Sequence, residues 1–326
     1  MAVTVIPARP RIAAGWAAAA LSAASLCFWA LRVFSAPEDA QIHWSNILWA
    51  PMQVDGVRLD HAALMVEAAI EGASAPVRMQ LDLGTYGTVM YRSAYRRLRG
   101  VDPATPGLVP MSGSIAGRPF HNEQFGFRAD EGGGSWAGPP MVLGSLGSSF
   151  FERRVLILDF VRQRLAILGR NARVPIALER SAEFLPAAFR YGHVVVAATI
   201  DGRPEPNLMF DTGSSGIPLF TGHGRWTALT HRTPADPANT IMHVGSWGRE
   251  AILIGAPLPG ALCVGSACLS HPVVYCEGSH LPNLDFDRHA DIAAGVIGNV
   301  LFDGRFTVIV DIARRRFGLL RGSPAI

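Results

Sequence analysis

The chain contains one short pattern twice, and both copies end in an acidic residue. Residues 68–90 read AAIEGASAPVRMQLDLGTYGTVM, and residues 198–219 read ATIDGRPEPNLMFDTGSSGIPL. In each copy an apolar segment, a turn at an acidic-Gly pair and a second apolar segment precede Asp82 or Asp211. A carboxylate at the end of an apolar strand loses hydration, which costs free energy unless a function requires it there. The repetition therefore predicts one site built from two halves, with one carboxylate from each.

A second repeat lies downstream of each copy. Residues 141–168 and 295–320 both run from an apolar-apolar-Gly segment through a Phe-containing stretch to a β run that ends in Asp159 or Asp311. An Arg-bearing turn and a final strand follow in both, so we interpret these two acids as structural strand ends. Because the repeat is far longer than the units of solenoid proteins, it indicates duplication of a whole lobe.

The patterning predicts an all-β protein. Most segments alternate apolar and polar residues with a period of two and are bounded by Gly, Pro, Asn or Asp. Residues 91–98 carry the clearest helical signal, and residues 132–140 are predicted to form a loop. The predicted parts are a cytoplasmic N-terminus at 1–12, a membrane span at 13–34, a linker at 35–55, a first lobe at 56–170, a connection at 171–189 and a second lobe at 190–326.

The N-terminal segment is long and apolar enough to span a membrane. Arg9 and Arg11 precede residues 13–34, while Glu38 and Asp39 follow, so the positive-inside rule places the N-terminus in the cytoplasm. A cleaved signal peptide is the alternative. The chain has no Lys and is rich in Ala, Gly and Pro, which suggests a high-GC bacterial gene. We therefore expect a single-pass protein of the bacterial inner membrane, bound to the lipid bilayer, with its main part in the periplasm.

Three cysteines follow the apolar segment, in a region that is oxidising if this topology holds. Cys263 and Cys268 flank a Gly-Ser turn in ALCVGSACLS and are the predicted disulfide pair, while pairing with Cys276 remains open. No matching Cys or His pair has ligand spacing, so no metal site is expected. A net charge of +3 over 326 residues gives no reason to expect a nucleic-acid partner. We expect a monomer.

Two carboxylates held close together titrate as a coupled pair. Like charges raise one pKa, so Asp82 and Asp211 would share a proton. One acid can then act as general base on a water while the protonated one polarises a carbonyl. Small and hydroxylated neighbours fit this chemistry, because they permit tight turns and supply hydrogen bonds to the acids. These supporting residues are Gly84, Thr85, Thr212, Gly213 and Ser214.

These motifs resemble the two halves of a pepsin-like aspartic protease. MQLDLGTYGTVMY with VLGSLGSSFFERRVLILDF is similar to the first half, and MFDTGSSGIPLF with IGNVLFDGRFTVIVDI is similar to the second. The resemblance covers about residues 60–322. It implies a bilobed all-β fold, two related β-barrel lobes with a central cleft, and endopeptidase activity on polypeptides without metal or cofactor. It also implies catalysis by Asp82 and Asp211, and packing of Gly144 and Gly298 beside the two active loops.

The chain departs from the family pattern at two places. Leu83 stands where Thr or Ser is usual, which removes one hydroxyl from the reciprocal hydrogen bonds between the lobes. The hairpin that closes over substrate, the flap, is assigned to residues 109–120, where Pro110 stands roughly where a Tyr is expected. These departures leave a second interpretation open: a catalytically silent pepsin-like module that binds peptide or a partner protein. The assigned flap residues are Met111, Ser112, Gly113 and Ser114.

Overall fold

The computed structural model describes residues 42–101, 107–128, 140–246, 249–278, 286 and 293–322. The chain divides into a unit of Met1–Ile42 and a unit of His43–Ile326, and the elements below belong to the second. The predicted membrane span, the residues before it and most of the predicted linker lie outside the described residues. In the part that is described, no helix is both long and apolar enough to cross a membrane.

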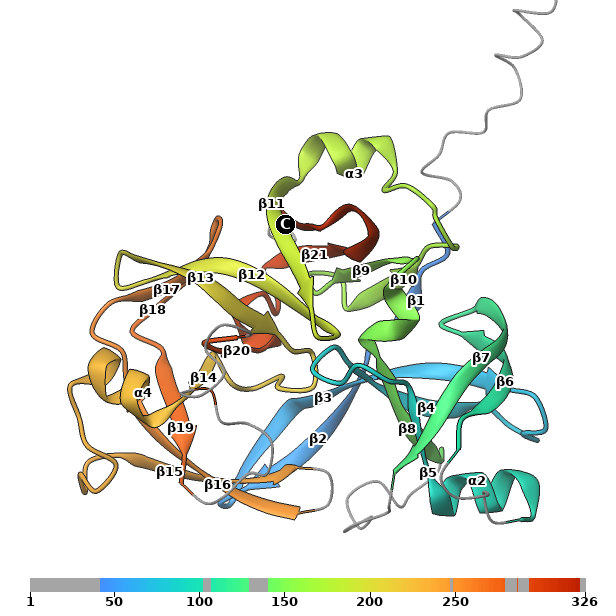
Figure 1. The fold of residues 1–326 in the computed structure, drawn as a ribbon, viewed down its shortest axis with the longest axis horizontal. Coiled ribbons are helices and arrows are strands. Elements are labelled where there is room, and N and C mark those ends of the chain that lie inside the picture. Colours follow the sequence, from blue (N-terminus) through green and yellow to red (C-terminus); the bar gives the residue numbers. More distant parts are fainter. Residues whose placement is uncertain are drawn as a thin grey trace, which may run out of the picture. The chain divides into compact units, whose positions relative to one another are not determined.

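The first half of the fold, residues 48–151, is a seven-stranded sheet in the order β2-β3-β4-β8-β5-β7-β6 (Figure 1). Helix α2 (Arg92–Arg99) follows β5 and ends at Gly100, whose φ of 73° lies in the left-handed region that glycine favours. The helix predicted at 91–98 is thus confirmed to within one residue. The strands are β2 (Leu48–Val54), β3 (Val57–Ile70), β4 (Val77–Asp82), β5 (Val89–Tyr91), β6 (Val109–Ile115), β7 (Arg118–Arg128) and β8 (Val142–Gly147).

The second half, residues 191–301, repeats this arrangement. In the first half β8 lies between β4, to which it is parallel, and β5; in the second β20 lies between β13, to which it is parallel, and β14. Helix α4 (His223–Thr230) follows β14 as α2 follows β5. The predicted duplication is therefore present in the topology. The strands are β12 (His193–Ile200), β13 (Arg203–Phe210), β14 (Leu219–Thr221), β15 (Thr240–Ser246), β16 (Arg249–Pro257), β17 (Ala261–Val264), β18 (Ala267–Ser270), β19 (Val273–Glu277) and β20 (Gly295–Ile297).

A shared set of strands joins the two halves, in the order β1-β10-β9-β21-β22-β11 (Figure 1). The predicted connection at 171–189 contributes helix α3 and most of β11 to this region. The predicted linker contributes β1 to this region and β2 to the sheet of the first half. The bounds are β1 (Ser45–Asn46), β9 (Val155–Asp159), β10 (Arg164–Ile167), α3 (Ile176–Ser181), β11 (Glu183–Arg190), β21 (Phe306–Asp311) and β22 (Arg316–Arg321), with short 3-10 helices at Ser148–Phe151, Asn299–Leu301 and Ile312–Arg314.

The two acids at the strand ends of the shared sheet are ion-paired, as their interpretation as structural residues requires. Asp159 accepts a hydrogen bond from Arg164 Nε at 2.9 Å, and Asp311 accepts one from Arg316 Nε, also at 2.9 Å. Both carboxylates are buried, so a charged partner is needed to offset their lost hydration. Their hydrogen bonds stabilise the turn after each strand, and neither acid belongs to the site described below.

The predicted disulfide is present. Cys263 on β17 faces Cys268 on β18 in an antiparallel pair, their Cα atoms are 4.1 Å apart, and the two sulfurs are bonded. Cys276 on β19 is buried and stays outside the disulfide. The bridge closes a short hairpin at the edge of the second half and lies apart from the acids.

Candidate active site

The two halves place their acids at equivalent positions. Asp82 is the last residue of β4, and Asp211 follows directly after β13. Apolar residues anchor both strands in the core, where Leu81 and Phe210 are fully buried. Both acids thus lie at the ends of strands that are anchored in the core. The packing of the sheets therefore fixes where each acid lies.

The carboxyl groups of Asp82 and Asp211 lie close together, because one point, the position of a Cβ on Gly213, is 2.8 Å from Oδ1 of Asp82 and 3.1 Å from Oδ1 of Asp211. Two glycines make this approach possible. A Cβ on Gly84 would lie 2.4 Å from Cγ of Asp211, and a Cβ on Gly213 would lie 2.8 Å from Oδ1 of Asp82. Any side chain at either position would occupy the space of the opposite acid. The structure thus brings together the two acids that the sequence predicted as a pair.

Hydrogen-bond donors are unevenly divided between the two acids. Asp211 Oδ1 accepts from the backbone N–H of Gly213 at 2.7 Å and of Gly84, from the other half, at 3.0 Å. Asp211 Oδ2 accepts from Ser214 Oγ at 2.6 Å. Asp82 Oδ2 accepts from Thr85 Oγ1 at 3.1 Å. Negative charge is therefore better stabilised on Asp211.

Burial and the neighbouring acid raise the pKa of Asp82. Only 7% of Asp82 is exposed, whereas Asp211 is half-buried. Loss of hydration is the largest cause and the negative charge of Asp211 the next, while the Thr85 hydroxyl acts in the opposite direction; together they raise the pKa of Asp82 from 3.8 to about 8. At neutral pH Asp82 therefore holds a proton, whereas the hydrogen-bond donors converge on Asp211.

Thr212 joins the two halves with hydrogen bonds in both directions. Its Oγ1 accepts from the backbone N–H of Leu83 at 3.0 Å and donates to the carbonyl of Leu81 at 2.8 Å. Thr212 is fully buried, as is Leu83, which occupies the equivalent position in the first motif. The Leu83 side chain carries no oxygen, so it cannot return these hydrogen bonds. This connection is one-sided, as the sequence predicted.

The glycine assigned to the first half requires correction. The register pairs Asp82 with Gly147 on β8, while Gly144 pairs with Met79, three residues before the acid. A Cβ on Gly147 would lie 2.4 Å from the carbonyl oxygen of Gly87, just as a Cβ on Gly298 would lie 1.8 Å from that of Ser214. Gly147, rather than Gly144, is therefore the counterpart of Gly298 beside the active loops.

The flap assignment does not fit the structure. Strand β6, which contains Met111–Ser114, is hydrogen-bonded to β3 on one side and to β7 on the other. A Cβ on Gly113 would lie 2.1 Å from the carbonyl oxygen of Ala69. These residues form an interior strand of the first sheet, and none of their described contacts reaches either acid.

A different hairpin, formed by β2 and β3, reaches from the first half to the second. At its tip Asp55 Oδ2 accepts from the backbone N–H of His243 on β15 at 3.0 Å. Leu59 lies 3.9 Å from the position of a Cβ on Gly216, in the loop that contains Asp211. Figure 1 shows this hairpin running towards β15 and β16. It is a first-half element that contacts the second half near the Asp211 loop, and nothing in the sequence pattern distinguished it from an ordinary β-hairpin.

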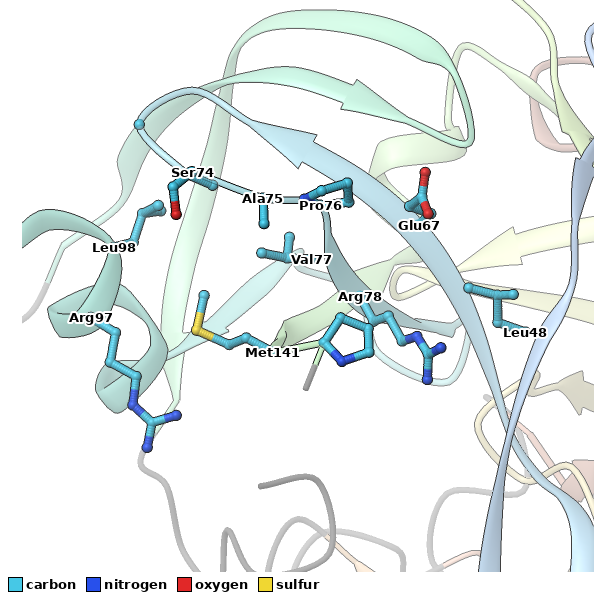
Figure 2. A pocket seen from close by; sticks show the side chains of 13 residues that line it. Leu48, Glu67, Ser74, Ala75, Pro76, Val77, Arg78, Arg97, Leu98 and Met141 are labelled. Carbon is cyan, nitrogen blue, oxygen red and sulfur yellow. The ribbon is translucent and has the colours of Figure 1, made fainter. Parts of the chain in front are cut away.

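A separate pocket of about 680 Å³ lies beside the first sheet and does not include the acids. Figure 2 shows its lining, which includes the turn before β4, Arg97 and Leu98 of helix α2, and Met141. No cluster of three or more His, Cys, Asp or Glu residues suited to a metal ion occurs among the described residues.

Comparison with known proteins gives remote structural similarity only. No protein-family model matches the chain, and no curated protein matches its sequence. An aspartic proteinase from Irpex lacteus is similar with a TM-score of 0.46 and 10% identity, over 86% of this chain and 98% of that one. The basic 7S globulin from soybean has a TM-score of 0.45 and 13% identity, over 87% and 96%. Conglutin gamma, a basic 7S globulin from lupine seeds, has a TM-score of 0.44 and 12% identity, over 87% and 96%. The protein is thus mostly β and similar to solved structures that include an aspartic proteinase, while its activity has to be argued from the site.

Proposed function

We propose that the protein is an aspartic endopeptidase with a pepsin-like fold, in which Asp82 and Asp211 hydrolyse peptide bonds through a water held between them. The observation that carries the proposal is the adjacent carboxyl pair, in which the pKa of Asp82 is raised to about 8 and three hydrogen bonds converge on Asp211. A structural role requires no such pair, because two adjacent like charges destabilise the folded state unless they share a proton.

The mechanism starts with Asp82 protonated and Asp211 ionised. Asp211 takes a proton from the water as the water oxygen bonds to the carbonyl carbon of the substrate, and Asp82 gives its proton to the carbonyl oxygen. The resulting gem-diol then breaks its C–N bond. One of its hydroxyls returns a proton to Asp82, and Asp211 gives its proton to the leaving nitrogen. Both acids end in the states in which they began, so the cycle consumes only water and substrate.

The proposal includes a membrane tether at residues 13–34, with the catalytic part in the periplasm of a bacterium. It is supported by the apolar sequence and its flanking charges. The disulfide between Cys263 and Cys268 fits an oxidising compartment. If the proposal holds, the full chain will stay in the membrane fraction of a Gram-negative host after carbonate washing, and protease added to spheroplasts will digest it. Release into the soluble fraction would contradict the tether.

Cleavage of a mixed peptide library by the full chain tests the activity. We expect products that depend on pH and are suppressed both by a pepstatin-type inhibitor and by Asp211→Asn. A second preparation carrying Asp236→Asn serves as the control, because Asp236 lies on an exposed turn remote from both motifs. Absence of cleavage at every pH from acidic to mildly alkaline would contradict the proposal.

The missing hydroxyl at Leu83 favours a second candidate, a silent module that binds peptide without cleaving it. The same library distinguishes the two functions, because the module would retain peptides unchanged. Binding that survives Asp211→Asn, with no turnover by the unmodified chain, would favour the module over the enzyme.

A further inference from the structure

The segment that follows β20 is hydrogen-bonded to the loop that follows β13. The backbone N–H of Gly298 donates to the carbonyl of Ile217 at 3.0 Å, and that of Val300 donates to the carbonyl of Ser215 at 2.9 Å. Asn299 lies between these two hydrogen bonds and is only 1% exposed. Its side chain is therefore enclosed within the second half, beside the acid-bearing loop and out of reach of a substrate.

The Asn299 amide makes two hydrogen bonds to this loop. Its Nδ2 donates to the carbonyl of Thr212 and to Oγ of Ser215, both at 2.9 Å, and Ser215 Oγ itself donates to the same carbonyl at 3.1 Å. Asn299 Oδ1 is buried and has no hydrogen-bond partner among the described residues. Because a carbonyl oxygen can only accept, the Thr212 carbonyl requires the amide to turn its nitrogen towards the loop. An unpaired oxygen is costly in a buried position, so the two donated hydrogen bonds are what this side chain contributes.

The carbonyl that Asn299 contacts belongs to a peptide group that also contacts Asp211. The same peptide unit carries the N–H of Gly213, which donates to Asp211 Oδ1 at 2.7 Å, the shorter of the two backbone hydrogen bonds to this acid. Hydrogen bonds in a chain polarise one another, so a donor to the carbonyl strengthens the N–H on the other side of the amide. Asn299 thereby strengthens a donor that stabilises charge on Asp211.

The equivalent residue of the first half makes a different contact. Ser148 and Asn299 each follow the glycine that packs beside an active loop, and each begins a short 3-10 helix. Ser148 Oγ, however, donates to the carbonyl of Gly192 in the second half. The first-half side chain therefore links the two halves, whereas the second-half side chain supports its own acid-bearing loop.

We propose that Asn299 is a positioning residue of the Asp211 loop, which strengthens the Gly213 N–H through the Thr212 carbonyl and so favours the ionised form of Asp211. Because Asn299 acts through a peptide group, it does not need to touch the water or the substrate. The part of this role that concerns catalysis rests on the proposed function, whereas the polarisation of the Gly213 amide does not. The two parts can therefore fail separately.

The first test removes the amide and keeps a side chain of similar size. Asn299→Leu in the full chain removes both donated hydrogen bonds, and Ser148→Ala removes a hydroxyl at the equivalent first-half position as the control. We expect Asn299→Leu to lower kcat about 3-fold to 10-fold, the effect of one lost hydrogen bond, with little change in KM. The acid limb of its pH–activity profile should move to higher pH, because the ionised form of Asp211 is stabilised less. An acid limb that stays in place in Asn299→Leu, or moves equally in Ser148→Ala, would overturn the catalytic part.

The second test makes the hydrogen bond depend on pH. The side chain introduced by Asn299→Asp has the shape of the amide but can donate only while it is protonated. We expect the kcat of this variant, relative to that of the unmodified chain at the same pH, to be highest at acidic pH and to fall towards the level of Asn299→Leu as the carboxyl ionises. A kcat no higher than that of Asn299→Leu even at acidic pH would overturn the catalytic part, because a protonated carboxyl restores a donor.

The amide proton of Gly213 gives a readout that needs no catalysis. It should resonate further upfield in Asn299→Leu than in the unmodified chain, because its N–H is less polarised, and should stay in place in Ser148→Ala. Ser215→Ala removes the other donor to the Thr212 carbonyl and should also give an upfield shift. Failure of the proposed function alone would leave these shifts as expected. An unchanged Gly213 amide in Asn299→Leu, or in Ser215→Ala should Asn299→Leu not fold, would overturn the inference whether or not the chain cleaves peptide.

Discussion

The two motifs of this protein share their backbone geometry but differ in polarity. Asp211-Thr212-Gly213-Ser214 contributes a bridging hydroxyl and an acid that accepts three hydrogen bonds. Asp82-Leu83-Gly84-Thr85 contributes a more deeply buried acid and an apolar side chain at the bridging position. The glycines are equivalent, since each makes room for the opposite carboxyl.

This difference assigns separate tasks to two acids of the same type. The first motif buries its carboxyl and so raises its pKa, while the second surrounds its carboxyl with hydrogen-bond donors that can stabilise negative charge. Strand packing brings the pair together, and the surrounding residues determine which acid carries the proton.

Removing either acid gives the largest expected effect. Asp211→Asn removes the base and Asp82→Asn the acid, so we expect each to lower kcat/KM by about 10²–10⁴-fold. Steady-state cleavage of one selected peptide measures this. The account fails here if either variant keeps more than about a tenth of the activity.

The next largest effect is on stability. It concerns the position that bridges the two halves, which is Thr212 in the second motif and Leu83 in the first. Thr212→Val leaves the Leu83 N–H and the Leu81 carbonyl buried without their partner, at about 1–3 kcal/mol each. Leu83→Val removes one methylene from the core and costs about 1 kcal/mol. Urea unfolding should therefore show a larger loss for Thr212→Val. Equal losses would mean that the two positions are energetically alike.

The protonated acid predicts an unusual dependence of stability on pH. The folded-state pKa of Asp82 is raised from 3.8 to about 8, so its contribution to stability is complete below pH 3.8 and is lost as the pH rises through about 8. Asp82→Asn does not titrate at this position. The free energy of unfolding of this variant, measured relative to that of the unmodified protein, should increase from about pH 4 to about pH 8, by at most about 1.4 kcal/mol for each pH unit. A difference that does not vary with pH would contradict a raised pKa.

The smallest effect concerns the hydroxyl of the first motif. Thr85 donates to Asp82 and so lowers its pKa, against the larger effect of burial. Thr85→Val should raise the pKa of Asp82 further and move the alkaline limb of the pH–activity profile to higher pH, because activity needs Asp82 protonated. Ser214→Ala is the matched control, since it removes a donor from Asp211 instead. A shift of the alkaline limb to lower pH in Thr85→Val would reverse this interpretation.

Local sequence predicted the parts of the site that depend on local chemistry. The acids at the ends of apolar strands, the helix near residues 91–98 and the disulfide across a Gly-Ser turn each follow from a few neighbouring residues. The duplication gave the pairing of Asp82 with Asp211, because two equivalent motifs imply equivalent positions.

Features that depend on register or on distant contacts were not predictable in the same way. Gly144 and Gly147 lie in the same short segment, and only the pairing of β4 with β8 shows which one faces Asp82. Gly113 matched a flap in sequence, yet it is needed where β6 passes close to Ala69.

A carboxyl titration tests the central claim, that Asp82 and Asp211 share a proton held by Asp82, most directly. Carbon-13 NMR of aspartate carboxyls in the full chain, from about pH 3 to about pH 9, should reveal one group that titrates near pH 8. That signal should be absent in Asp82→Asn, and in Asp211→Asn its pKa should fall but stay above 3.8, because burial remains the largest cause of the shift. Titration of every aspartate below about pH 5 would contradict the account, since both carboxyls would then be ionised at neutral pH.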